Sequence, residues 1–193
     1  NNVLNYSGIK IEDTNKKGLE DMLEGKNYEL TKLRPNLFFL HLQDYKVKGN
    51  LDEKFKKQIS ILKKEFKHII IDGSPVMNLD NVFVDVAEHI IVPTFLDSVT
   101  TNSILNLLKK TDISKIRAVI PNRVGRTKIE KDFYTFLKNK LTRSGVFLSI
   151  PINQSSIILK LIENGTLLWE RRSQKLDEIK NVFVKVWREI EDE

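Results

Sequence analysis

The sequence predicts an α/β fold in which helices cover a mostly parallel sheet, and two observations lead to this class. Short apolar segments that suit strands alternate with longer segments in which apolar residues recur at helical spacing. One apolar segment, Ile69 to Ile71, is an unbroken run of isoleucines, which is typical of a parallel strand buried on both faces. At 193 residues the chain is long enough for a sizeable core. We therefore expect residues 1–193 to form a single domain.

Charge and composition restrict the functional classes. The chain carries 32 Lys and Arg against 26 Asp and Glu, a formal net charge of +6, so nucleic acid or another polyanion is a reasonable partner. The absence of cysteine excludes disulfides, thiolate metal sites and Cys nucleophiles. No apolar run approaches the roughly 20 residues that a membrane span needs, and no signal-peptide pattern is present. These features predict a cytoplasmic protein.

The chain up to residue 72 contains two expected helices and two expected strands. Gly25 is placed to end the first helix. Asn50 is placed to cap the second helix, in which lysines separate the apolar residues. His41 lies in the first strand and is expected to pack there rather than bind a ligand, because no second His or carboxylate pairs with it in the sequence. The expected elements are a helix around 19–23, a strand over 37–42, a helix over 51–66 and a strand over 69–71.

The remainder of the chain continues the alternation of strands and helices. Thr127 and Glu130 have the spacing of a capping box, and Ile129 and Phe136 are expected on the buried face of the helix that follows. Trp187 falls in the apolar stripe of the last helix, which explains it as a core residue. The expected elements are strands over 89–95, 116–124 and 146–151, and helices over 98–110, 127–141, 155–163 and 174–191.

Asp72 directly follows the isoleucine run and precedes a Gly-Ser-Pro turn. Ligands of open α/β sheets bind at the carboxyl ends of the strands, so an acid at this place is a candidate metal or phosphate-site residue. Asp is also a common residue with which a chain leaves a strand and begins a turn. Both interpretations of Asp72 are open from the residues alone.

Five segments, taken in order, resemble the ParA/MinD family of deviant-Walker P-loop ATPases, and together they run along nearly the whole chain. The segment at 66–75, FKHIIIDGSP, is similar to the stretch that contains the family's Walker B-like strand. The other four are GLEDMLEGK with LRPNLFFLHL, AEHIIVPTF, IRAVIPNRV with the following Arg-Thr, and VFLSIPINQSSIILKLIENGTLLWE.

The resemblance implies a nucleotide site with ATP and Mg²⁺ as its ligands. Asp72 matches the Walker B-like acid, which holds the magnesium ion through water. The groups concerned all follow strands, so we expect them to gather at one sheet edge. The residues carried over from the family are Asp72 with the turn Gly73, Ser74 and Pro75, then Asn122 and Arg123 beside the adenine, and Pro151 and Ile152 on the loop that faces it.

The sequence departs from the family at the phosphate-binding loop. A P-loop ends in Gly-Lys-Ser/Thr, whereas Gly25 and Lys26 are followed by Asn27 and do not follow a strand. The family's first βαβ portion, with the Walker A Lys and the catalytic switch Asp, would precede Asn1. We therefore expect either the C-terminal three-quarters of the ATPase fold or a naturally degenerate relative. This chain alone is not expected to bind ATP well or hydrolyse it, and its catalytic residues are unknown.

Within the family, the basic bias favours the DNA-partition branch, in plasmid or chromosome segregation. The resemblance then implies ATP-dependent homodimers that bind non-specific DNA on the nucleoid and are stimulated by a ParB-type partner protein. Phosphate contacts from Lys and Arg supply such binding, although a solvated helix face explains the same residues. The family's Arg after the Ile-Pro motif is not matched, since Gln154 and Ser155 stand there. The candidate DNA-binding residues are Arg117, Arg126, Lys128, Lys131, Lys138, Lys140 and Arg143.

Three alternatives to the partition function are open. A nucleotide-free pseudo-ATPase would keep the fold for interaction or dimerisation. A MinD-like membrane-associated ATPase is disfavoured, because anionic lipid would repel Glu191, Asp192 and Glu193, so no membrane partner is expected. An unrelated flavodoxin-like or receiver-like domain does not explain Asn122 and Arg123.

Overall fold

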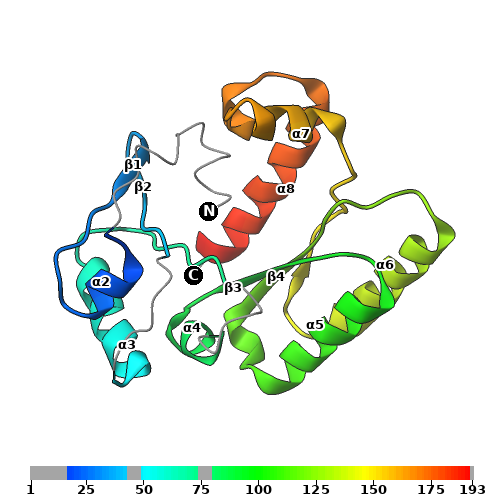
Figure 1. Ribbon diagram of the computed structural model, residues 1–193. Helices are drawn as coiled ribbons and strands as arrows, with labels where there is room; N and C mark the ends of the chain where they lie inside the picture. Colours follow the sequence, from blue (N-terminus) through cyan, green and yellow to red (C-terminus); the bar gives the residue numbers. More distant parts are fainter. Residues whose placement is uncertain (1–16, 43–48, 74–79, 192–193) are drawn as a thin grey trace. The chain divides into compact units, whose positions relative to one another are not determined.

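The computed structural model describes residues 17–42, 49–73 and 80–191, and the chain divides into two compact units. Unit 1 comprises Asn1–Val86 and Ile162–Thr166, and unit 2 comprises Ala87–Leu161 and Leu167–Glu193. The expectation of one domain over residues 1–193 stays a prediction. The predicted α/β class is confirmed, because unit 2 is built on a parallel sheet flanked by helices (Figure 1).

The sheet of unit 2 has three parallel strands in the order β3-β4-β5. The central strand, β4, is the longest and is buried along almost its whole length. Each strand begins and ends within the segment that the sequence predicts for it, because fewer residues pair with a neighbouring strand than belong to the apolar run. The strands are β3 (Ile90–Thr94), β4 (Ile116–Pro121) and β5 (Phe147–Leu148).

Helices cover both faces of this sheet. Ile116 and Val119 of β4 belong to the apolar cluster that includes residues of α5 and α6, whereas Ala118 and Ile120 belong to the cluster that includes residues of α8. Figure 1 shows α8 on one side of the strands and α5 and α6 on the other. The helices of unit 2 are α5 (Ser98–Lys110), α6 (Lys128–Leu141) and α8 (Gln174–Glu191), with the 3-10 turns η2 (Ile113–Lys115) and η3 (Leu168–Glu170). Helix α7 (Ser156–Glu163) belongs to unit 2 up to Leu161, and its last two residues belong to unit 1.

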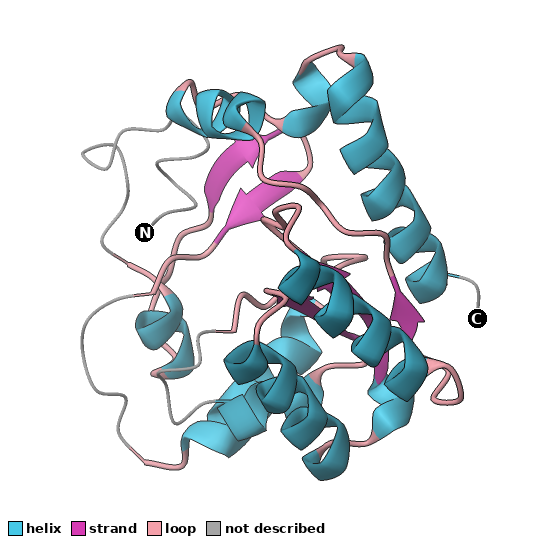
Figure 2. Cartoon of the chain, turned by 90° about the vertical axis from the view of Figure 1, so that its right-hand side faces the viewer, coloured by secondary structure: helices cyan, strands magenta, loops and turns pink. Residues whose placement is uncertain are grey.

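The described residues of unit 1 form a two-stranded antiparallel sheet and three helices. The strands pair through a short turn in which Asn36 has a φ of +61° (Figure 2). Helix α3 packs against α2 and α4, where the rings of Phe55 and Phe83 lie 5.0 Å apart. His41 is 6% exposed, so it packs in the interior as predicted. The elements are α2 (Leu19–Leu23), β1 (Thr31–Arg34), β2 (Leu37–Phe39), α3 (Leu51–Leu62) and α4 (Asp80–Val86).

The prediction that residues 69–71 form a strand buried on both faces is wrong for this structure. The segment has no regular secondary structure and belongs to no β-ladder among the described residues. Ile69 and Ile71 pack against the cluster of α2 and α3, whereas Ile70 is 82% exposed. Only one side of the segment finds an apolar neighbour, and a strand buried on both faces requires paired backbone groups and two covering layers.

Two helices expose apolar residues that the sequence places on their buried faces. In α6, Leu137 and Leu141 are buried, but Ile129 is 66% exposed and Phe136 is also exposed. At 3.6 residues per turn, the side chains of Ile129 and Phe136 lie to one side of the line through Leu137 and Leu141. Trp187 of α8 is likewise partly exposed, so its assignment to the core is wrong in part.

Within the described part of the chain, no helix combines the length and the apolar character needed to cross a membrane.

Candidate functional site

The loops that follow β3, β4 and β5 meet at the carboxyl edge of the sheet, and main-chain hydrogen bonds join them. The Asn122 N–H donates to the carbonyl oxygen of Thr94 (2.7 Å), which links the second loop to the end of β3. The Ile152 N–H donates to the carbonyl oxygen of Pro121 (2.8 Å), and the Val124 N–H donates back to Ile152 (3.0 Å). The three loops therefore form one connected backbone surface, which does not depend on the identity of the exposed side chains.

Asn122 and Arg123 occupy the middle of this surface. The Asn122 Oδ1 accepts a hydrogen bond from the Arg123 N–H (2.9 Å), and Arg123 has a φ of +52°. The left-handed region costs a residue with a Cβ about 1–2 kcal/mol, and Asn supports local turns of this kind through its side chain. The bond leaves the Asn122 side-chain NH₂ group able to donate and holds Arg123 at an exposed position.

Pro151 and Ile152 lie beside these residues through the backbone pairing just described. Ile152 is 8% exposed and its side chain belongs to the cluster beneath α8. Any contact from Ile152 to a ligand at this edge would therefore come from its backbone. Pro151 is half-buried. The structure thus brings Asn122, Arg123, Pro151 and Ile152 together, as the sequence predicts for residues that follow neighbouring parallel strands.

Asp72 and Gly73 belong to unit 1, where both are exposed. Ser74 and Pro75 lie outside the described residues. Among the residues that the structure describes, no group of three or more His, Asp and Glu side chains is placed to hold a metal ion. Magnesium in nucleotide sites is commonly held by one or two carboxylates together with substrate phosphates and water. Asp72 alone therefore fits a magnesium ion only when nucleotide phosphates hold the ion as well.

The turn from β4 into α6 is fixed by the predicted capping box. The Thr127 Oγ1 accepts from the Glu130 N–H (3.2 Å), and the Glu130 carboxylate accepts from the Thr127 hydroxyl (2.6 Å) and the Thr127 N–H (3.1 Å). The Gly125 N–H donates to the same carboxylate (2.7 Å). These bonds, first that from the Thr127 hydroxyl, lower the pKa of Glu130 from its usual value.

Gly125 is a residue of this turn that the sequence interpretation missed. A Cβ at this position would lie 2.9 Å from the Glu130 Oε2, so a side chain would displace the carboxylate that closes the cap. The order Gly-Arg-Thr directly before a helical first turn that contains Glu130 is the sequence pattern that could have identified Gly125 as part of this turn.

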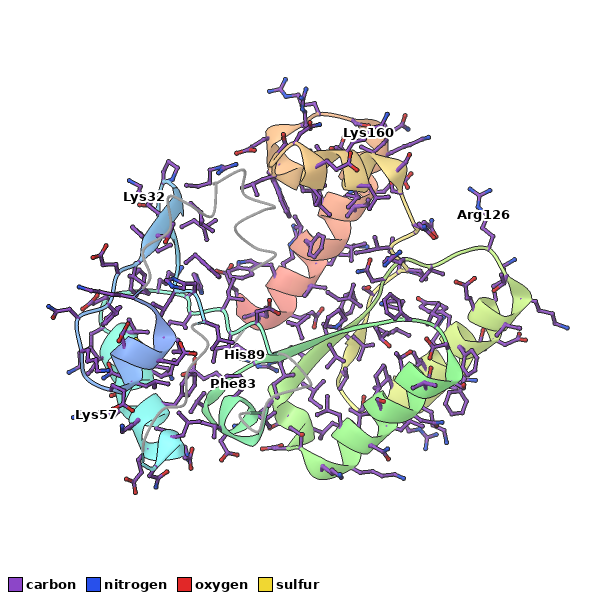
Figure 3. All side chains as sticks on the ribbon, in the orientation of Figure 1. Lys32, Lys57, Phe83, His89, Arg126 and Lys160 are labelled. Carbon is purple, nitrogen blue, oxygen red and sulfur yellow. The ribbon has the colours of Figure 1, made fainter. Side chains whose placement is uncertain are left out.

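The basic residues predicted to bind DNA separate into two places. Arg117 lies on β4, is half-buried, and donates from its Nε to the Nδ1 of His89 (3.2 Å). The other six are exposed on α6 or beside its ends, and Figure 3 shows the Arg126 side chain pointing outward from the loop that precedes α6. We call these six the α6 basic face: Arg126, Lys128, Lys131, Lys138, Lys140 and Arg143.

The sequence matches no protein-family model, and no curated protein is significantly similar to it. The three-dimensional fold does have a solved counterpart. The MinD cell division protein of Aquifex aeolicus superimposes with a TM-score of 0.71 over 98% of this chain and 80% of that chain, at 15% sequence identity. The chain has the MinD fold. This likeness confirms the predicted fold class, while membership of the ParA/MinD family and the roles of individual residues in the MinD fold of this chain stay predictions.

Proposed function

We propose that this chain is the DNA-binding portion of a ParA-like partition ATPase, and the observation that carries the proposal is the α6 basic face. In this proposal the full-length form dimerises with ATP, binds non-specific DNA on the nucleoid and is stimulated by a ParB-type partner. The MinD fold supports the ATPase architecture. The resemblance of the ordered motifs supplies the partition branch.

The basic charge of the chain is concentrated at α6. Residues 126–143 contain six Lys and Arg against two acidic residues, a net of +4, compared with +6 for all 193 residues. One of the two acids, Glu130, is already bonded within the capping box. None of the six cations forms an ion pair with a carboxylate in the described ranges. Cations without a protein counter-charge are the groups that release counterions when they contact DNA phosphates.

The geometry of α6 places part of this charge on one side. Lys128, Lys131 and Lys138 are spaced by three and seven residues, which puts their side chains on the same side of a helix. Lys140 lies elsewhere, with its Nζ 5.5 Å from the centre of the Phe136 ring. The three lysines are therefore the ones that a single duplex backbone can contact together.

The nucleotide half of the proposal uses the carboxyl edge of the sheet. Asn122 and Arg123 would lie beside the base, next to the backbone of Pro151 and Ile152. Asp72, followed in the sequence by Gly73, Ser74 and Pro75, would hold the magnesium ion through water. ATP hydrolysis further requires a Gly-Lys-Ser/Thr loop, which this sequence does not contain. A second candidate is a nucleotide-free pseudo-ATPase that keeps the fold for dimerisation.

The test is the affinity of the 193-residue chain for a fluorescent duplex of arbitrary sequence, measured by anisotropy over a range of KCl concentrations. The triple variant K128E/K131E/K138E is expected to weaken binding at least tenfold and to reduce the slope of log K against log salt by about 0.9 for each lost phosphate contact. Its matched control is K57E/K64E/K175E, which changes the same charge at exposed lysines of other segments.

Equal losses in the two triple variants would mean that net charge alone sets the affinity, and the α6 basic face would then have no special role. Sedimentation of the same chain without nucleotide tests the second candidate. A stable dimer that ignores DNA would favour the pseudo-ATPase.

A further inference from the structure

Two aromatic side chains of unit 2, Trp169 and Phe183, form an exposed pair. Their ring centres lie 6.1 Å apart with an interplanar angle of 56°. Trp169 is 59% exposed and Phe183 is 39% exposed. Trp187, one turn further along α8, is exposed as well. Large apolar rings that gather at the surface mark a binding site for a partner or a ligand. We call these three residues the aromatic patch.

The turn that carries Trp169 is held on both sides. The Glu170 carboxylate accepts from the Leu167 N–H (2.8 Å), which closes the η3 turn. After the turn, the Lys180 Nζ donates to the carbonyl oxygen of Arg171 (2.7 Å), which joins the chain to α8. The exposed indole is therefore carried by a fixed backbone, so a ligand that stacks on it needs to order little of the protein.

Three cations follow Trp169 closely in the sequence, namely Arg171, Arg172 and Lys175. All three are exposed, and in the described part of the chain none of their side chains forms an ion pair or a hydrogen bond. Glu170 is the one acid of residues 168–175, so three cations against one acid give this segment a net charge of +2. Its carboxylate is already bonded within the η3 turn.

The other charges of α8 do not cancel this excess. Asp177 forms an ion pair with Lys180 (3.2 Å), which is neutral as a pair. Glu178 precedes Phe183 by five residues, about 140° around the helix from that ring, so it lies on another side of α8. The charged residues further along the helix, two cations and two acids, balance one another: Lys185, Arg188, Glu189 and Glu191.

We propose that the aromatic patch and the three cations bind single-stranded nucleic acid. Bases of a single strand stack on exposed rings whatever their sequence, while Lys and Arg contact the phosphates between them. Bases of a duplex are already stacked on one another, so a duplex would use the cations and leave the rings unused. The aromatic patch thus differs in ligand from the α6 basic face. The proposal does not rest on the partition function, because neither α6 nor the candidate nucleotide loops take part in it.

The experiment is a titration of the 193-residue chain with a fluorescently labelled oligothymidylate of about ten nucleotides, a length within the range that single-strand binding modules cover. Binding is followed by anisotropy of the label and, with unlabelled oligothymidylate, by tryptophan emission. The chain has two tryptophans, so Trp187→Phe leaves Trp169 as the one emitter and keeps an aromatic ring at residue 187. We expect the oligonucleotide to quench Trp169 saturably. Trp169→Ala is expected to raise the dissociation constant about fivefold to 150-fold, and Trp169→Phe should recover most of the affinity.

The role of the cations is tested by the salt dependence of the same dissociation constant. The double variant R171Q/R172Q is expected to weaken binding and to reduce the slope of log K against log salt by about 0.7 for each lost phosphate contact. Its matched control is K57Q/K64Q, which removes the same charge at exposed lysines of unit 1 and should leave the slope unchanged.

Quenching that does not saturate would overturn the proposal, as would equal affinities of the wild type and Trp169→Ala. Equal losses in the two double variants would also overturn it, because net charge alone would then set the affinity. Emission that changes with protein concentration in the absence of oligonucleotide would assign the aromatic patch to a contact between copies of the chain, which would overturn the proposal too.

A duplex of the same length separates this proposal from the partition function. The triple variant K128E/K131E/K138E should lose affinity for the duplex and keep saturable binding of oligothymidylate. Loss of both ligands in that variant would overturn the separate single-strand site. Saturable oligothymidylate binding by a wild-type chain that does not bind the duplex would refute the partition function alone.

Discussion

Arg123 offers a test of the backbone geometry at the candidate nucleotide edge. Its φ of +52° places a residue with a Cβ in the left-handed region, at a cost of about 1–2 kcal/mol. Arg123→Gly removes that cost, but it also raises the conformational entropy of the unfolded chain, which lowers the free energy of unfolding by about 0.4–1 kcal/mol. Arg123→Ala keeps the strain and removes the same guanidinium. The Gly variant should therefore be more stable than the Ala variant by about 1 kcal/mol.

Tryptophan fluorescence is the appropriate assay for this comparison. The chain has two tryptophans, Trp169 and Trp187, and both belong to unit 2, as does Arg123. Thermal unfolding followed by their emission therefore reports on the unit that carries the substitution. A difference of 1 kcal/mol corresponds to about 2 °C or more in a chain of this size. We expect Arg123→Gly to melt at least that much above Arg123→Ala.

The outcome that would refute the reasoning is equal melting temperatures for the two variants. The side chain is removed in both, so only the backbone conformation separates them. Equal stability would show that residue 123 does not adopt the left-handed conformation in solution, and that the hydrogen bond from its N–H to the Asn122 Oδ1 does not hold the loop.

Two further predictions concern the capping box and the isoleucine run. The pKa of Glu130 is lowered in the folded state, so its contribution to stability is present above its usual pKa of 4.5 and is lost as the pH falls through the folded-state value. The difference in unfolding free energy between wild type and Glu130→Gln, measured by urea titration, should therefore shrink in acid. A difference that stays constant with pH would contradict this. Ile70→Asn should change the free energy of unfolding by less than about 0.5 kcal/mol, whereas Ile71→Asn should lower it by about 1–3 kcal/mol. Unfolding followed by circular dichroism measures both values. Similar losses for the two variants would support the original prediction of a strand buried on both faces.

Much of the fold was predictable where periodicity and end signals agree. Helices α5 and α8 begin and end at the predicted residues, since each has an apolar stripe, and α5 has in addition an N-cap at Asp97. The predicted Asn50 cap and the capping box at Thr127 are both confirmed. Strand β1 and helix α4 were missed because both are short. Leu33 is the one apolar residue of β1, and most apolar residues of α4 run consecutively over 82–84 instead of recurring at helical spacing.

The isoleucine run failed for a different reason. Periodicity describes which side chains prefer burial, but burial on two faces also requires a neighbour on each face. Ile69 and Ile71 find one in the cluster of α2 and α3, and Ile70 does not. The residue pattern gives the preference of a segment, and the surrounding chain decides whether that preference is met.

The candidate site likewise shows what a residue pattern can predict and what depends on the surrounding chain. The sequence placed Asn122, Arg123 and Pro151 after strands, so their gathering at one edge followed from parallel topology. It did not predict the backbone bonds that join the loops, because main-chain donors and acceptors are the same at almost every residue. It also gave no indication that the Ile152 side chain turns into the core.

Helix α6 connects the two edges of the sheet, and this position constrains how its variants are interpreted. Its 14 residues span about 21 Å at 1.5 Å per residue. The capping box fixes its start beside the candidate nucleotide loops, and the Ser144 hydroxyl donates to the carbonyl oxygen of Leu141 at its last turn, where the chain leads into β5. A substitution that loosens the first turn would therefore also disturb the candidate nucleotide loops. The exposed side chains of Lys131 and Lys138 take part in neither set of bonds, so a loss of DNA affinity on their substitution reflects the contact itself.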